Sequence, residues 1–153
     1  ERLAPTPSLI PTDPQARVTM FGLANELCGE NGFGWMGRLM LVDIGMEPLV
    51  KEGPEWNFWR RFGQKYGLSD AALAAAPGRM AECLQLLDAQ LAASQAAGGR
   101  YFFGDQLTAL DIYWATFLGM IDPLPEDLCP MASFFRPLYT NTHPVVRAAL
   151  SQR

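Results

Sequence analysis

The stretch that decides the fold spans residues 100–121 and reads RYFFGDQLTALDIYWATFLGMI. A turn comes first and an apolar run follows it, with Thr108 and Asp111 at the junction. This spacing predicts a capping box, in which the Thr108 hydroxyl accepts the backbone N–H of Asp111 and the Asp111 carboxylate accepts that of Thr108. Leu107 and Ile112 flank the cap and can close over it as a hydrophobic staple. We therefore predict a helix that begins directly after Thr108.

The helix after this cap carries no charged residue between positions 112 and 121. Apolar side chains lie on every side of it, so we expect the helix to be buried in the centre of a bundle. It offers roughly ten apolar residues, too few for a bilayer, which needs about 20. No run of alternating β-branched residues occurs elsewhere in the chain. The sequence therefore predicts an all-α fold, an irregular bundle of about five main helices.

The composition indicates one folded domain and argues against several kinds of partner. The chain has 153 residues, of which 49% are hydrophobic and 18% charged, so it can bury a core and disorder is not expected. Its net charge of −4 and its scattered arginines argue against a nucleic-acid partner and against a polybasic membrane contact. The three cysteines, at positions 28, 83 and 129, have no CxxC spacing, so we expect reduced thiols in a cytoplasmic protein.

Residues 1–12 contain three prolines and no helical period, so we expect an interdomain linker there and a helical domain in residues 13–153. Asp13 and Pro14 form a typical helix start. The glycines between residues 29 and 34 break this helix, and a second helix follows, with apolar residues at helical spacing. On the first helix we expect two adjoining faces to be buried. One carries Val18, Phe21, Asn25 and Cys28, and the other carries Met20, Leu23, Ala24 and Leu27.

The centre and the end of the chain continue this pattern of helices and breaks. We expect a helix in residues 54–67, then a short Ala-rich helix that Ser69 caps and Pro77 stops. An amphipathic helix is expected in residues 80–98, and a short apolar helix in residues 131–139. The helix in residues 54–67 is expected to pack through Trp56, Phe58, Trp59 and Phe62.

No catalytic centre is apparent in these residues. The single histidine, His143, precedes Pro144 and is expected to stand at the start of the last helix. Glu26 and Glu30 lie four apart without a histidine partner, so we expect a solvated face and not a metal site. Cys28 lies near the C-terminal end of its helix, where the helix dipole opposes a thiolate. We therefore expect neither a catalytic residue nor a metal in this chain.

Two segments resemble a known family. Residues 104–111, GDQLTALD, match the Gly-Asp-x-[Leu/Phe]-[Ser/Thr]-x-Ala-Asp signature of soluble glutathione transferases, with Leu110 where the family usually has alanine. Residues 9–17, LIPTDPQAR, match the Leu-[Ile/Leu]-Pro-x-Asp-Pro-x-x-Arg segment that joins the two domains of these enzymes. The chain thus resembles the C-terminal, all-helical domain of a glutathione transferase, and residues 1–3 resemble the tail of the domain before it.

The resemblance implies a mode of action. In the family, a thioredoxin-like N-terminal domain binds glutathione and supplies the Tyr, Ser or Cys that stabilises its thiolate. The helical domain walls the pocket of a small hydrophobic electrophile. The full-length protein would then be a homodimeric, detoxifying transferase whose first two helices offer the subunit interface, and this chain alone would be inactive.

The same resemblance points to individual residues. Arg17, Thr108 and Asp111 belong to the two matching segments and are expected to hold the fold. The family's pocket wall comes from the distal half of the first long helix and from one face of the capped helix. Carried over, the substrate-binding residues are Asn25, Cys28, Trp35, Leu39, Trp114 and Phe117.

Two other functions fit the same fold. Transferase-like helical modules attached to translation factors and aminoacyl-tRNA synthetases serve only protein assembly, and a domain of this shape could also carry hydrophobic ligands. An open apolar cleft beside the linker distinguishes the enzyme from the assembly module, which can fill that cleft with side chains.

Overall fold

The computed structural model describes residue 3 and residues 6–150 of the chain. Over these residues it contains six α-helices, one 3-10 helix and no strand, which confirms the all-α prediction. The elements in order are α1 (Pro14–Cys28), α2 (Phe33–Met46), α3 (Pro54–Gln64), α4 (Asp70–Ala96), α5 (Ala109–Leu118), the 3-10 helix η1 (Arg136–Tyr139) and α6 (Pro144–Leu150).

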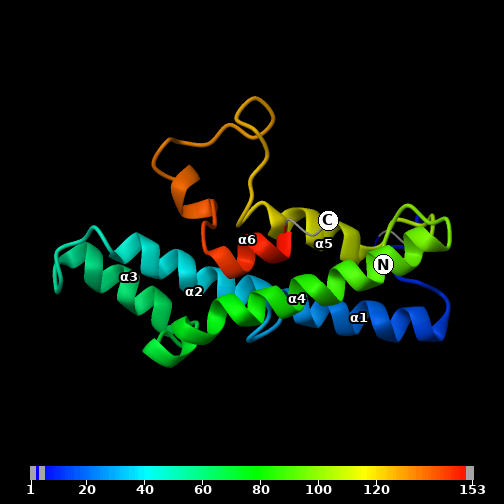
Figure 1. Ribbon diagram of the computed structural model, residues 1–153, viewed down its shortest axis with the longest axis horizontal. Helices are drawn as coiled ribbons and strands as arrows, with labels where there is room; N and C mark the ends of the chain where they lie inside the picture. The colour runs from blue at the N-terminus through cyan, green and yellow to red at the C-terminus, as the bar shows by residue number, and fades with distance from the viewer. Residues whose placement is uncertain (1–2, 4–5, 151–153) are drawn as a thin grey trace.

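The helices form an elongated bundle along α4 (Figure 1). The long helix α4 packs against α2 and against α6, while α3 folds back beside α2 at one end of the molecule. At the other end α1 packs against α5. After α5 the chain leaves the bundle as a projecting segment, residues 122–140, which we call the arm, and returns to the bundle through η1 (Figure 1).

One hydrophobic core joins these helices. Its centre is fully buried, with Leu27, Leu39, Met80 and Leu110 at 0% exposure. The contributions come from α1, α2, α4, α5, α6 and the turn before α5. Its buried members are Met20, Leu27, Phe33, Met36, Leu39, Ala76, Met80, Cys83, Leu84, Leu87, Phe102, Leu110, Ile121 and Val146.

The capping box at the start of α5 is present, as predicted. The Asp111 carboxylate accepts the backbone N–H of Thr108 at 2.8 Å and the Thr108 hydroxyl at 2.7 Å. It also accepts the N–H of Phe102 at 3.0 Å, which ties the preceding turn to the helix. The N–H of Ala109 donates to the carbonyl of Leu9 at 2.8 Å, so the proposed linker lies against the same helix start.

Two expectations about buried helix faces are wrong. On α1 the face of Met20 and Leu27 is buried, but Val18 and Phe21 on the other face are 68% and 47% exposed. On α5 only Leu110 is fully buried, and Ile112 on another side is 42% exposed. Both helices pack against each other and the core, and no other described element covers their outer sides. Apolar composition alone therefore overestimated how many sides are buried.

Two further expectations need correction. Pro77 does not stop a helix, because α4 runs without a break from Asp70 to Ala96 with Pro77 buried inside it. An internal proline costs about 3 kcal/mol, and burial of the neighbouring Ala76 and Met80 offsets that cost. Residues 131–139 form only the 3-10 turn η1. The expectation that residues 1–3 end an earlier helix falls mostly on residues 1 and 2, which lie outside the described residues.

Candidate functional site

The two site residues predicted on α1 face water. Asn25 and Cys28 are both exposed, and they share the outer face of α1 with Val18 and Phe21. Arg17 is also exposed on this helix, and its guanidinium lies 5.2 Å from the centre of the Phe21 ring. This face is open in the chain described here and forms no enclosed wall.

The two site residues predicted on α5 pack onto the start of α2. The Trp114 ring meets the Phe33 ring edge to face, with 5.8 Å between centroids. The Phe117 ring lies so close to Gly34 that a Cβ there would collide with it. Glycine at position 34 therefore lets α5 and α2 approach each other closely.

The remaining two predicted residues lie on α2 but have different environments. Leu39 is fully buried in the core. Trp35 is half-buried, donates its indole N–H to the carbonyl of Tyr66 at 2.8 Å, and packs edge to face on the Tyr66 ring. The six predicted residues therefore do not come together in one cavity.

A different apolar cavity lies between α2, α3 and the end of the arm. It has a volume of about 350 Å³, within the range of small-molecule sites. Among the described residues, Arg38 is the only charged one in its wall. We call it the aromatic pocket, and it is lined by Arg38, Leu41, Phe58, Trp59, Phe62, Phe135, Leu138 and Tyr139.

Aromatic packing builds the α3 wall of this pocket. Phe58 and Phe62 lie one turn apart with nearly parallel rings, 7° between planes and 6.5 Å between centroids. Trp59 meets Phe62 edge to face at 6.1 Å, and Phe62 meets Tyr66 at 5.4 Å. Tyr66 in turn packs edge to face with Trp35, so Trp35 supports this row of rings indirectly, through Tyr66. Edge-to-face contacts of this kind fix ring orientation.

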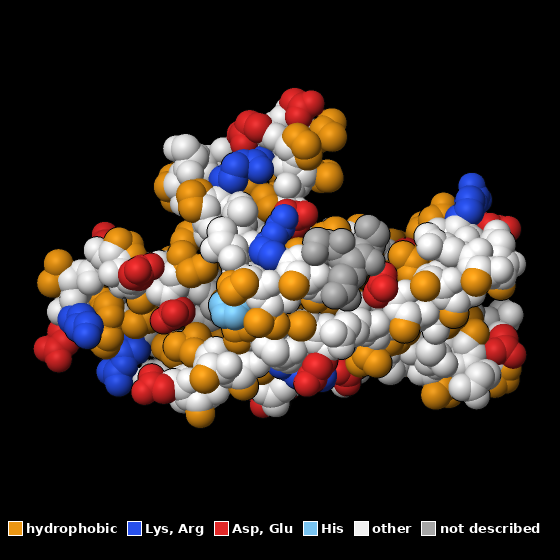
Figure 2. Space-filling view, in the orientation of Figure 1, with side chains coloured by type: hydrophobic (Ala, Val, Ile, Leu, Met, Phe, Trp, Pro, Cys, Tyr) orange, Lys and Arg blue, Asp and Glu red, His pale blue; other side chains and the backbone are white. Residues whose placement is uncertain are grey.

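The arm forms the opposite wall, and one arginine organises it. The Arg136 guanidinium donates to the Glu126 carboxylate at 2.6 Å, to the carbonyl of Leu124 at 3.2 Å and to the carbonyl of Cys129 at 2.8 Å. The Glu126 carboxylate also accepts the N–H of Met131 at 3.1 Å. These bonds hold the arm in a defined shape, although several of its hydrophobic side chains stay exposed to solvent, as the arm in Figure 2 shows.

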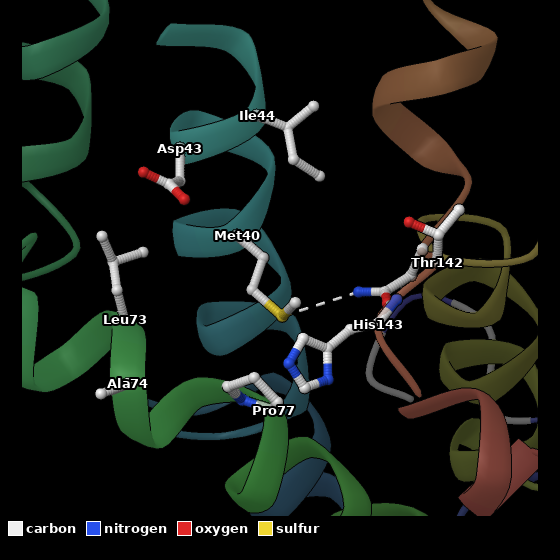
Figure 3. Close-up of a pocket in the computed structure, with 9 residues that line it drawn as sticks. Met40, Asp43, Ile44, Leu73, Ala74, Pro77, Thr142 and His143 are labelled. Atoms are coloured by element: carbon white, nitrogen blue, oxygen red, sulfur yellow. Dashed lines mark hydrogen bonds between the residues drawn. The ribbon is translucent and has the colours of Figure 1, made fainter. Parts of the chain in front are cut away.

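A second cavity, of about 320 Å³, is lined in part by the single histidine, His143 (Figure 3). It lies between α2, the first turns of α4 and residues 141–143, and Met40, Pro77 and His143 are among its lining residues. The Asn141 side-chain amide lies 3.6 Å from the sulfur of Met40 and its oxygen accepts the N–H of His143 at 2.9 Å. The His143 Nδ1 atom is buried and has no hydrogen-bond partner.

This histidine cavity does not form a catalytic pair. The carbonyl of His143 accepts the N–H of Arg147, so His143 stands at the start of α6 as predicted. The only carboxylate in the wall is Asp43, which is exposed, and no hydrogen bond links it to the imidazole among the described residues. The observed role of His143 is therefore that its carbonyl accepts the N–H of Arg147 at the start of α6.

The environments of Cys28, Cys83 and Glu26 bear on their reactivity. Partial desolvation raises the pKa of the largely exposed Cys28 thiol, and burial raises the pKa of the Cys83 thiol, so neither is a thiolate at neutral pH. Glu26 forms an ion pair with Arg79 of α4, which corrects the expectation of a merely solvated face. Over the described residues no group of three or more His, Cys, Asp or Glu side chains could hold a metal ion. In that same part of the chain, none of the helices could cross a membrane.

Comparison with known families agrees with this architecture. The family model for the glutathione S-transferase C-terminal domain matches residues 62–148, more than half of the chain. The chain therefore belongs to the family of glutathione S-transferase C-terminal domains. The match begins at the end of α3 and includes α4, the capped helix α5, the arm and α6 as far as residue 148. No curated protein and no solved structure matches the chain significantly.

Sequence reasoning missed most of the aromatic pocket. A usable signal was the spacing of Phe58 and Phe62 on α3, since residues four apart share one helix face. The contributions of Arg38 on α2 and Leu138 on the arm depend on tertiary packing, which no local pattern in the sequence reports.

Proposed function

We propose that this chain is the co-substrate-binding domain of a glutathione transferase and that the aromatic pocket receives the hydrophobic co-substrate. Membership of the family supports glutathione as the second substrate. The observation that carries the proposal is the open apolar cavity on α2, lined by six aromatic or aliphatic side chains from α3 and the arm besides Leu41 and Arg38.

The position of this pocket supports the assignment. The family resemblance places the co-substrate wall on the distal half of the first long helix. In this chain that helix is broken into α1 and α2, so its distal half is α2. Arg38 and Leu41 of α2 line the aromatic pocket, whereas Asn25 and Cys28 of α1 lie on an open surface. We therefore place the co-substrate between α2, α3 and the arm, whereas the sequence predicted a site on α1, α2 and α5.

In this proposal the glutathione thiolate that forms the new bond is held and stabilised by another domain. The thiolate sulfur of glutathione forms a bond to the electrophilic carbon, and the leaving group departs with its electron pair. A thioredoxin-like domain would bind glutathione and stabilise the thiolate. The aromatic pocket would hold the reacting ring beside the sulfur, exclude water and lower the entropic cost of the encounter.

Two exposed apolar surfaces fit the partners that the family suggests. The linker residue Leu9 is hydrogen-bonded to Ala109, so a preceding thioredoxin-like domain would sit near the exposed Ile112 and Tyr113 of α5. The exposed Val18 and Phe21 of α1 would lie in the interface of a homodimer. Burial of such apolar surface contributes about 25 cal/mol for each Å². We also place the protein in the cytoplasm.

An assembly module of the same fold is the second candidate. It would be favoured if the aromatic pocket were filled, because a scaffold has no need of an open cavity. The open pocket of about 350 Å³ favours the enzyme over the assembly module, but it lies beside α3 and not beside the linker, where the sequence placed the cleft. A carrier of hydrophobic ligands would share the open pocket but would bind its ligand without consuming glutathione.

The test compares two tryptophans of α3 in the full-length protein. Trp59 lines the aromatic pocket, whereas Trp56 lies outside it on the same helix with Arg60 over its ring. We expect the protein to conjugate glutathione to a chlorodinitrobenzene and Trp59→Ala to raise the KM for that electrophile about tenfold, while Trp56→Ala leaves it unchanged. Absence of conjugation would remove the enzyme proposal, and equal effects of the two variants would move the co-substrate elsewhere.

A further inference from the structure

The charge in the wall of the aromatic pocket is a single arginine. The seven other lining residues are hydrophobic or aromatic, with the Tyr139 hydroxyl and the Trp59 indole N–H as their polar side-chain groups. Arg38 projects from α2 and is half-buried, and its guanidinium lies 6.0 Å from the centre of the Phe62 ring. A cation over an aromatic face at this distance is held loosely, and its N–H donors stay available to a ligand.

In the described part of the chain, four other arginines form ion pairs with carboxylates. Over the described residues the ion pairs join Arg79 to Glu26 and Glu82, Arg100 to Asp105, Arg136 to Glu126, and Arg147 to Asp122. Arg38 takes part in none of these pairs, and in the same part of the chain its guanidinium donates no hydrogen bond. A half-buried cation without an anion favours binding one from outside.

The rest of the pocket fits the ring of such a ligand. Phe58 is 64% exposed and Phe135 is 44% exposed, although both face an apolar cavity. A flat aromatic ring between α3 and the arm would cover them and gain hydrophobic free energy. The net charge of the chain is −4, so attraction of an anion to this place depends on the local charge of Arg38 and not on the overall field.

We propose that Arg38 is a specificity-determining residue, which makes the aromatic pocket select flat aromatic ligands that carry a carboxylate. This inference rests on the proposed function, because it takes the aromatic pocket as the co-substrate site. The guanidinium binds the carboxylate in a bidentate manner at the α2 wall, and the aromatic ring lies between Trp59, Phe62 and the arm. Arginine suits this role better than lysine because its planar fork matches a carboxylate.

The experiment uses two ligands that differ only in charge. Binding of 2-naphthoate and of its neutral isostere 2-naphthamide to the full-length protein is measured by isothermal titration calorimetry. We expect naphthoate to bind about tenfold or more tightly than naphthamide, as a charge-assisted hydrogen-bonded pair allows. Arg38→Gln should abolish that preference, and Arg38→Lys should retain part of it. The matched control is Arg60→Gln, which removes an arginine that lies over Trp56 outside the pocket and should keep the full preference.

The outcomes separate this inference from the function on which it rests. If both ligands bind equally to the parent protein, or if Arg38→Gln keeps the preference, Arg38 does not select anions, while the pocket itself stands. If neither ligand binds, the inference falls, and the aromatic pocket loses its role as co-substrate site as well. Thermal unfolding of each variant checks the fold, and we expect no large change for Arg38→Gln because its guanidinium has no ion pair to lose.

Discussion

Two cavities of similar volume lie on different faces of α2, and their walls differ in kind. The aromatic pocket, of about 350 Å³, has walls from α3 and the arm, which lie at the edge of the bundle. The histidine cavity, of about 320 Å³, has walls from α4 and the segment before α6, which belong to the bundle itself. The second wall includes Met40 and Leu73, which pack against the core. Cavity volume alone therefore does not identify a functional site.

The two cavities also differ in their polar groups. In the aromatic pocket the half-buried Arg38 faces apolar rings without a carboxylate partner. In the histidine cavity the side-chain oxygen of Asn141 accepts the backbone N–H of His143. The buried Nδ1 of His143 has no hydrogen-bond partner among the described residues. A guanidinium without an anionic partner can bind an anion, whereas a buried Nδ1 without a partner lowers stability. We therefore propose binding for the first cavity and a structural role for the second.

The largest expected effect tests whether Leu39 of α2 belongs to the core and not to the aromatic pocket. Leu39 lies fully in the core and Leu41 lines the aromatic pocket. We expect Leu39→Ala to lower the free energy of unfolding by about 2–5 kcal/mol, because it leaves a cavity in the core. Urea titration measures this loss, and binding of 2-naphthoate below the unfolding transition should not change. A variant with normal stability and weakened binding would place Leu39 in the pocket, as the sequence suggested.

The next effect tests the close contact between α2 and α5 at Gly34. Gly34→Ala would push against the Phe117 ring and should cost about 1–3 kcal/mol of stability through overpacking. Gly22→Ala on α1 is the matched control, since a Cβ there meets nothing within 4 Å. That variant should be neutral or more stable by up to about 1 kcal/mol. Equal melting temperatures for the two variants would show that Gly34 does not set this contact.

A smaller effect tests the cap of α5. Thr108→Ala removes one half of the capping box and should lower the free energy of unfolding by about 1 kcal/mol. The change lies away from both cavities, so ligand binding to the aromatic pocket should stay the same. Urea titration of a variant as stable as the parent would show that the capping box contributes nothing.

This cap was predictable because its partners are three residues apart. Thr108 and Asp111 follow from local geometry, and so does the start of α1 at Asp13, whose carboxylate accepts the N–H of Ala16 at 2.7 Å. The exposure of Val18 and the continuity of α4 through Pro77 were not predictable, because tertiary packing decides them. The aromatic pocket was missed for the same reason, since Arg38 and Leu138 are a hundred residues apart and only the folded arm brings them together.

The smallest expected effect tests the structural role of the histidine cavity. His143→Phe removes the buried Nδ1 that has no partner and keeps a ring of similar size. We expect the free energy of unfolding to stay the same or to rise by up to about 1 kcal/mol, because an unsatisfied polar group is costly. Glutathione conjugation by the full-length protein should be unaffected. A large loss of kcat in this variant, with unchanged stability, would give His143 a part in the reaction.

The most direct test of the account is a crystal structure of the full-length protein with the glutathione conjugate of an aromatic electrophile. We expect the aromatic ring between α3 and the arm, in contact with Trp59 and Phe62 and with Arg38 at its edge. A ring bound instead on the outer face of α1, against Asn25 and Cys28, would contradict this and favour part of the site that the sequence predicted.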